Sequence, residues 1–237
     1  MKRFWNTVTV EPDPSGHAIL LDGRKMHLPG GAVLRIGSAS LADAIAAEWQ
    51  AAGADAGKEL SFADMPLTQL AGTAQERIAA NPSVTIDAIA RYGETDLLCY
   101  RADSPPVLVQ RQAQHWQPWL DWAAATYDAP LRVTTGVTHI RQHHDSINAL
   151  RRAVAQLDLH ALAALGIAVP ALGSLVLGLA LAEGALDAET AHALAVLDEL
   201  FQQEQWGEDA EAVARRTAVA GDIATAARFI RLTRGAA

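Results

Sequence analysis

Residues 7–28, TVTVEPDPSGHAILLDGRKMHL, decide the fold class of this 237-residue chain. Two β-rich runs, at 7–10 and 17–21, flank a Pro-, Asp- and Gly-rich stretch at 11–16 that is typical of a turn. The pair Asp22-Gly23 then predicts a tight hairpin into residues 25–28. The sequence therefore predicts a small antiparallel sheet at the N-terminus.

Helical patterns follow this sheet. Residues 40–43, Ser-Leu-Ala-Asp, match a capping box at a helix start, and Pro66 is placed where a second helix can begin. After a break at Asn81-Pro82, Ser83 is expected to cap a third helix. The fold class predicted is α+β, with a small antiparallel β-containing domain over residues 1–85 and a mainly α-helical bundle domain over residues 86–237.

Apolar residues recur at helical spacing through the second predicted domain. One stripe is formed by Val109, Ala113, Trp116, Leu120, Ala123 and Tyr127. The later helices are expected over residues 145–157, 159–168, 171–184, 187–205 and 208–234.

Residues 159–182 contain no Asp, Glu, Lys or Arg and reach the roughly 20 residues that span a bilayer. Pro170 interrupts this run, and acids rather than cations flank it, which disfavours a membrane span. We expect two buried helices that separate at Pro170, with their neighbours covering every face. A membrane-associated protein that uses this segment is the alternative.

The overall charge narrows the choice of partners. A net charge of −8 and no run of Lys or Arg argue against a nucleic-acid partner.

Cys99 is the sole cysteine, so the chain can form no internal disulfide, and its apolar neighbours indicate an inert thiol. The first residues lack the pattern of a signal or transit peptide. We expect a bacterial cytoplasmic protein, with the mitochondrial matrix as the less favoured location.

The candidates for catalytic or cofactor chemistry are few. Residues 53–59, GADAGKE, lack the spacing of a phosphate-binding loop and the Ser or Thr that follows its lysine. His139, His143 and His144 form the densest imidazole group, but the glutamate of a zinc-protease helix is absent. We predict no catalytic residues, no metal site and no cofactor. A helical metal-binding protein or enzyme that uses the three histidines remains the alternative.

Near the C-terminus, residues 197–211 read LDELFQQEQWGEDAE. Trp206 stands there among carboxylates and amides, between two helix-like segments. An aromatic side chain supplies contact area and the surrounding polar groups supply specificity, so this stretch is a candidate protein-docking edge. The alternative, which composition alone favours, is a helix corner in which Trp206 fills the core.

Seven short blocks, taken in order, make the chain resemble a known family. They are KRFW at 2–5, LLDGR at 20–24, AAEW at 46–49, MPLT at 65–68, DLLCYR at 96–101, GSLVLGLA at 173–180 and EQWGED at 204–209. The family is the ATP synthase assembly chaperones called ATP-twelve. The blocks extend over nearly the whole chain, so the resemblance is not confined to one domain.

The resemblance implies a function without catalysis. Members of this family handle the alpha subunit of the soluble catalytic head and mask its sticky surface until the beta subunit takes its place. The resemblance also implies a small α+β domain followed by a helical domain. It assigns partner binding to the polar tryptophan motif, here Glu204, Trp206, Gly207, Glu208 and Asp209. The three histidines are not a feature of the family, and the oligomeric state is not predicted.

Overall fold

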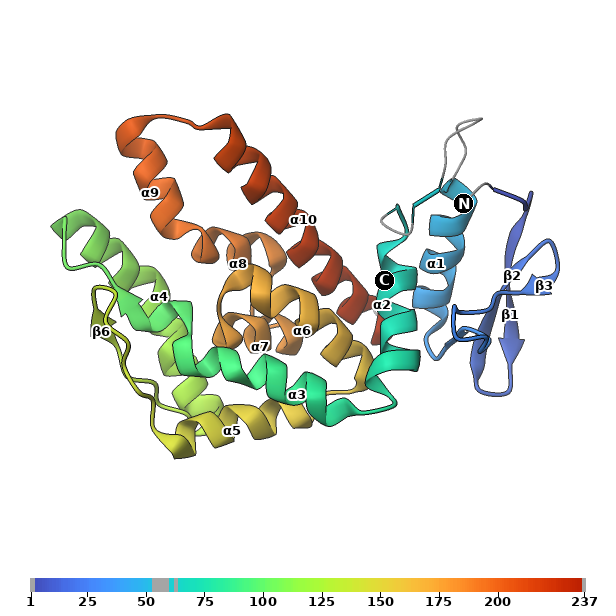
Figure 1. Ribbon diagram of the computed structural model, residues 1–237, viewed down its shortest axis with the longest axis horizontal. Coiled ribbons are helices and arrows are strands. Elements are labelled where there is room, and N and C mark those ends of the chain that lie inside the picture. Colours follow the sequence, from blue (N-terminus) through green and yellow to red (C-terminus); the bar gives the residue numbers. More distant parts are fainter. Residues whose placement is uncertain (1–2, 53–59, 62–63, 236–237) are drawn as a thin grey trace. The chain divides into compact units, whose positions relative to one another are not determined.

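The computed structural model describes residues 3–52, 60–61 and 64–235, and residues 53–59 lie outside this range (Figure 1). A small antiparallel sheet comes first and helices follow, so the predicted α+β class is confirmed. The chain forms two compact units, the first from residues 1–82, 159–164 and 228–237 and the second from 83–158 and 165–227. The predicted boundary at residue 85 concerns folding domains and stays a prediction.

The sheet of the first unit is built around one hairpin. Strand β1 (Val8–Asp13) pairs antiparallel with β2 (Gly16–Leu21), which also pairs with β3 (Arg24–Lys25) and β4 (Arg35–Ile36). Asp22 and Gly23 take the positive φ values, 48° and 77°, that a two-residue hairpin needs, which confirms the predicted turn. Strand β1 extends further than predicted, because an edge strand tolerates a proline such as Pro12.

The N-cap of helix α1 (Ala39–Ala51) lies two residues earlier than predicted, at Ser38 instead of Ser40. Ser38 has the extended backbone of an N-cap, and its side chain accepts a hydrogen bond from the Leu41 N–H at 3.5 Å. Ser40 lies inside the first turn, so the predicted box was wrong. The apolar face that the pattern indicated is correct, because Leu41, Ile45 and Trp49 are buried.

Helix α2 (Pro66–Gly72) begins at Pro66 as predicted and continues as a π-helical segment, Thr73–Ile78. The Glu48 carboxylate of α1 accepts hydrogen bonds from the N–H groups of Leu67 and Thr68, at 2.8 and 3.0 Å. This carboxylate satisfies the free donors at the start of α2, where no side chain of α2 itself serves as a cap.

The second unit is mainly helical. Its elements are α3 (Pro82–Ala90), the 3-10 turns Arg91–Thr95 and Leu97–Cys99, β5 (Tyr100–Arg101), α4 (Pro106–Tyr127), β6 (Thr134–Thr135), α5 (His144–Ala155), α7 (Leu175–Glu183), α8 (Ala188–Ala195) and α9 (Leu197–Trp206). Helices α6 (Leu159–Leu172) and α10 (Ala210–Thr233) contribute residues to both units. Ser83 is not the cap of α3, because this helix already begins at Pro82.

The apolar run at 159–182 forms two helices, but their boundary differs from the prediction. Pro170 lies inside α6, near its end, where the missing N–H removes one hydrogen bond of the last turn. The break comes at Gly173, with φ +63°, and Ser174, whose side chain accepts from the Leu177 N–H. Every residue from Leu175 to Ala182 is buried, as expected for a helix covered on all faces. No helix in the described part of the chain has the length and apolarity to cross a membrane.

The buried face of α4 was predicted correctly in its second half only. Trp116, Leu120 and Ala123 are buried, but in the first half Leu108 and Gln112 take the place of Val109 and Ala113. Gln112 is buried because its amide bonds the Ala102 N–H and the Asp198 carboxylate, at 2.8 and 2.7 Å. A polar residue at a core position cannot be found from apolar spacing. The predicted helix 187–205 is likewise two helices, α8 and α9, with the break at Val196.

A fully buried carboxylate connects two parts of the second unit. Asp96 accepts hydrogen bonds from the N–H groups of Leu98 and Val176, at 3.1 and 3.0 Å. Burial raises the pKa of Asp96 to about 6, and this effect outweighs the opposite effect of those hydrogen bonds. Asp96 therefore ties the turn Leu97–Cys99 to the start of α7.

Candidate partner-binding site

Helix α9 is fixed to α4 by charged and polar contacts. Two guanidinium nitrogens of Arg111 lie 2.6 and 2.9 Å from the two carboxylate oxygens of Glu204. The same guanidinium lies over the ring of Phe201, 5.2 Å from its centroid. Bidentate pairing and stacking both restrict the orientation of an arginine, so they fix the position of α9 against α4.

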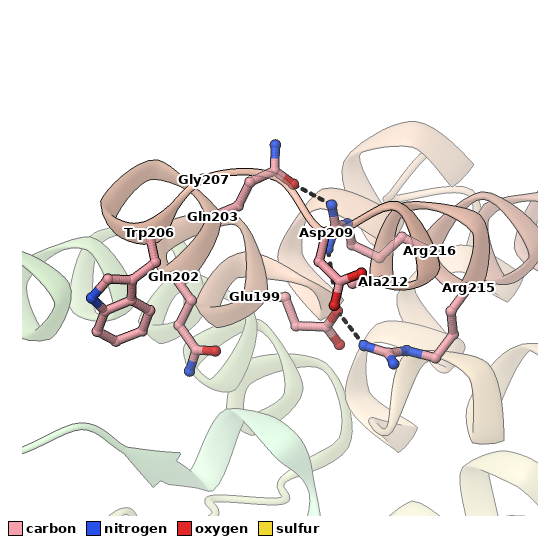
Figure 2. Close-up of a pocket in the computed structure, with 9 residues that line it drawn as sticks. All are labelled: Glu199, Gln202, Gln203, Trp206, Gly207, Asp209, Ala212, Arg215 and Arg216. Atoms are coloured by element: carbon pink, nitrogen blue, oxygen red, sulfur yellow. Dashed lines mark hydrogen bonds and ion pairs between the residues drawn. The ribbon is translucent and has the colours of Figure 1, made fainter.

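The opposite side of α9 is connected to α10. The Glu199 carboxylate forms ion pairs with the guanidinium groups of Arg215 and Arg216, with N–O distances of 3.0 and 3.6 Å. Arg216 also donates a hydrogen bond to the side-chain amide oxygen of Gln203 (Figure 2). Arg216 is buried although it is charged. A buried guanidinium needs such partners, which explains why a carboxylate and an amide of α9 face α10.

Trp206 ends α9 and projects into solvent, with 81% of its surface exposed. Figure 2 shows its ring directed away from Arg215 and Arg216. The alternative in which Trp206 fills a gap in the core is therefore wrong. An exposed tryptophan on a helix that is held on two sides offers a large, already oriented contact area.

The turn after Trp206 depends on two residues. Gly207 has φ +91° and ψ 176°, a conformation that side chains rarely adopt, and its N–H donates to the Gln203 carbonyl at 2.9 Å. Asp209 then accepts the Glu211 N–H at 2.9 Å, as a cap of α10 does. Gly207 thus stops α9 directly after Trp206, and Asp209 starts the next helix.

These residues surround a polar hollow of about 320 Å³ between α9 and α10. It is lined by Glu199, Gln202, Gln203, Trp206, Gly207, Asp209, Ala212, Arg215 and Arg216 (Figure 2). Carboxylates, amides and guanidinium groups all reach this surface, so it can both donate hydrogen bonds to a partner and accept them from it. We call this surface, with the exposed Trp206, the α9–α10 face.

The structure brings together only some of the residues predicted for partner binding. Trp206, Gly207 and Asp209 line the same hollow, and Glu208 is exposed in the turn between them. Glu204 lies on the other side of α9, against Arg111, where it lines a second hollow of about 390 Å³.

Sequence reasoning missed the residues that hold this surface in place. Arg111, Arg215 and Arg216 were not predicted to contribute, and Glu199 was included only as one of the carboxylates in the stretch 197–211. The spacing between Glu199 and Arg215 has no meaning until the turn at Gly207 is known. No local signal would have found these contacts.

The three histidines do not form one cluster, although His139 and His144 line the same hollow. The His139 Nδ1 lies 3.2 Å from the Tyr100 hydroxyl, His144 contacts the Asn148 amide, and His143 is the residue before α5. Among the described residues, no group of three or more His, Cys, Asp or Glu side chains could hold a metal ion. The alternative of a metal-binding protein that uses the three histidines therefore has no support in this part of the chain.

Cys99 is buried, as its apolar neighbours indicated. Burial, and after it the charge of Asp96, raises the pKa of its thiol to about 12. A thiol in this state does not form the reactive thiolate near neutral pH.

The fold and this surface define a class: an α+β protein whose helical unit presents a polar face with one exposed aromatic side chain. The chain belongs to the ATP12 chaperone protein family, whose model matches residues 2–124. The α9–α10 face lies beyond the residues that the family model matches.

Two solved structures and one curated relative are similar to the chain. Atp12 from Paracoccus denitrificans is 43% identical, with a TM-score of 0.91 and 98% of both chains covered. Atu1473 from Agrobacterium tumefaciens, a putative chaperone, is 38% identical, with a TM-score of 0.90, over 98% of this chain and 85% of that one. The mitochondrial atp12 protein of Schizosaccharomyces pombe is 24% identical over 229 residues, 90% of this chain and 76% of that protein.

Proposed function

We propose that this chaperone assists assembly of the catalytic head of ATP synthase. It binds the free alpha subunit and shields it from aggregation until the beta subunit takes its place. Membership of the ATP12 chaperone family supports the chaperone role. The observation that carries the choice of surface is Trp206, 81% exposed at the end of a helix fixed on both sides by charged contacts.

A shielding contact must be firm enough to prevent aggregation and weak enough to be released. An interface of about 800 Å² per partner, with an aromatic centre and a polar rim, meets both needs. Release then requires only that the beta subunit bind the same alpha surface more tightly, because exchange depends on a difference in affinity. The proposed mechanism makes and breaks no covalent bond and uses no cofactor.

The proposed encounter takes place in the cytoplasm. Two of the similar solved structures come from bacteria, and the fission yeast relative is mitochondrial. The excess of acidic residues gives a net charge of −8, which suits a protein client better than a nucleic acid.

The direct test is suppression of alpha-subunit aggregation, followed by light scattering at increasing chaperone concentrations. We expect Trp206→Ala and Glu208→Lys to lose most of the protection that the unchanged protein gives. The matched control is Phe4→Ala, because Phe4 is also an exposed aromatic, at 70%, but lies in the first unit. Full protection by both Trp206→Ala and Glu208→Lys would remove the α9–α10 face from the account.

A further inference from the structure

A third hollow lies in the helical unit and is lined by no residue of α9. It has a volume of about 310 Å³ and is lined by Glu94, His139, Arg141, Gln142, His144 and Ile147. These residues come from the turn Arg91–Thr95, from the loop that follows β6 and from the start of α5. The α9–α10 face shares none of them.

The loop that forms one wall is held by hydrogen bonds. The buried Gln142 side chain accepts from the Arg132 N–H at 2.7 Å and donates to the Arg132 carbonyl at 2.9 Å. Ser146 donates to the Pro130 carbonyl at 2.7 Å, and the Tyr100 hydroxyl lies 3.2 Å from His139. These bonds give the loop a defined position before any partner binds, which lowers the entropic cost of binding.

The charge of this segment is opposite to that of the chain. Residues 129–144 contain two arginines and three histidines but no acid, in a molecule with a net charge of −8. In the described part of the chain Arg141 is in no ion pair, and Arg132 donates one guanidinium N–H to the Arg141 carbonyl. The acids nearby are Glu94, on the wall, Asp128, directly before the segment, and Asp145, whose carboxylate lies 3.9 Å from His144.

Aliphatic side chains accompany these polar groups. Val137 is fully exposed and lies on the loop between β6 and His139, beside the residues that line the hollow in the sequence, and Val133, which is 40% exposed, directly precedes β6. Ile147 adds an apolar wall to the hollow itself. A small ion would leave these aliphatic groups in water, whereas a peptide segment would cover them, which is favourable in proportion to the apolar area removed from water.

We propose that this hollow is a docking site for an acidic segment of a partner protein, whose carboxylates pair with Arg141 and whose aliphatic side chains cover Val137. Arg141 and the imidazoles of His139 and His144 supply hydrogen-bond donors, and the guanidinium favours planar, bidentate recognition of a carboxylate. This site uses no residue of α9 or α10, so it adds a second contact surface to the chaperone.

The test is binding of a fluorescently labelled peptide that alternates Glu and Leu, measured by anisotropy with the full chain. We expect saturable binding that weakens with added salt and is lost when Gln replaces every Glu of the peptide. Arg141→Gln should weaken binding by about fivefold, the range of an exposed ion pair. Arg151→Gln, which removes an exposed arginine of α5 paired with Asp87, is the control and should bind as before.

Two further measurements complete the test. Val137→Ser should weaken peptide binding, and inorganic phosphate at millimolar concentration should compete only partly. Full competition by phosphate with no effect of Val137→Ser would make this a small-anion site and overturn the proposal. Absent binding, equal binding of the Gln peptide, or equal loss in Arg151→Gln would overturn it too. Trp206→Ala should leave the peptide affinity unchanged, which separates this proposal from the function assigned to the α9–α10 face.

Discussion

Arg111 and Glu204 are 93 residues apart in sequence, yet their side chains meet in two hydrogen bonds of 2.6 and 2.9 Å. This pair joins the long helix α4 to α9, the helix that ends in Trp206. The position of the helix that carries the exposed tryptophan thus depends on a contact that lies on a different side of α9 from its contacts with α10.

The first prediction concerns the charge of Glu204. The hydrogen bonds from Arg111 lower the pKa of its carboxyl below the ordinary 4.5. The stabilising contribution is therefore complete above the ordinary value and is lost as pH falls through the lowered, folded value. An NMR titration should show a pKa below 4.5 for the Glu204 carboxyl in the unchanged protein and a return of this pKa toward the ordinary value in Arg111→Gln. Equal titration in both proteins would show that the pair does not persist in solution.

Truncation to alanine should change the free energy of unfolding strongly at one tryptophan and hardly at all at another. Trp116 is fully buried, and its ring N–H donates to the Leu194 carbonyl at 2.9 Å. Trp116→Ala should reduce the free energy of unfolding by about 3–5 kcal/mol, as large buried side chains do. Trp206→Ala should change it by less than about 0.5 kcal/mol, because an exposed side chain is removed. Urea denaturation measures both, and a large loss in Trp206→Ala would mean that its ring packs against the protein.

Gly207 should be sensitive to a single added methyl group. A Cβ there meets no atom within 4 Å, but the φ of +91° is unfavourable for alanine. Gly207→Ala should therefore cost about 1–3 kcal/mol of stability and weaken alpha-subunit capture by disturbing the turn.

The control for this substitution is Gly221→Ala. Gly221 lies within α10, where its φ is not positive, and an added Cβ would also meet no atom within 4 Å. Alanine in place of a helical glycine should stabilise the protein by about 0.5–1 kcal/mol. If both variants behave alike, the backbone of Gly207 is not the cause.

Asp96 gives the protein a specific dependence on pH. Its folded pKa of about 6 lies above the ordinary 3.8, so between these values the folded state keeps a proton that the unfolded chain releases. Its contribution to stability is therefore complete below pH 4 and falls by roughly 3 kcal/mol as pH rises through 6. The difference in the free energy of unfolding between the unchanged protein and Asp96→Asn should change as the pH rises from about 4 to 6, with the unchanged protein losing stability. Above this pH range the difference should stay constant. A difference that stays constant from pH 4 to 7 would contradict the raised pKa.

Features fixed by neighbouring residues could be predicted from the sequence. Asp22-Gly23 dictates its own hairpin, and Pro66 marks the start of α2, because the required backbone angles belong to those residues themselves. Features that depend on distant partners could not be predicted. Ser38 replaces Ser40 as a cap, and Gln112 occupies a core position because Asp198 lies opposite it.

In the candidate site, too, the sequence predicted the local motif but not the contacts that depend on distant residues. The motif around Trp206 stands out in the sequence, but its exposure follows from the turn at Gly207, and composition alone favoured a buried ring. The contacts of Glu199 with Arg215 and Arg216 depend on how α9 and α10 pack, which no local pattern encodes. The apolar run at 159–182 was correctly divided into two helices, but only α7 is buried on every face, because Gly166, Ile167 and Pro170 of α6 are exposed. Gly173 and Ser174, rather than Pro170, place the break between the helices.

The proposed shielding of the alpha subunit and its replacement by beta are tested most directly by competition between this protein and the beta subunit for isolated alpha subunit. Alpha should be immobilised with the chaperone bound, beta added in increasing amounts, and both partners quantified in the bound fraction. Shielding followed by replacement predicts that the chaperone leaves as beta binds, one displacing the other. A stable complex that contains all three proteins, or an alpha subunit that never retains the chaperone, would contradict it.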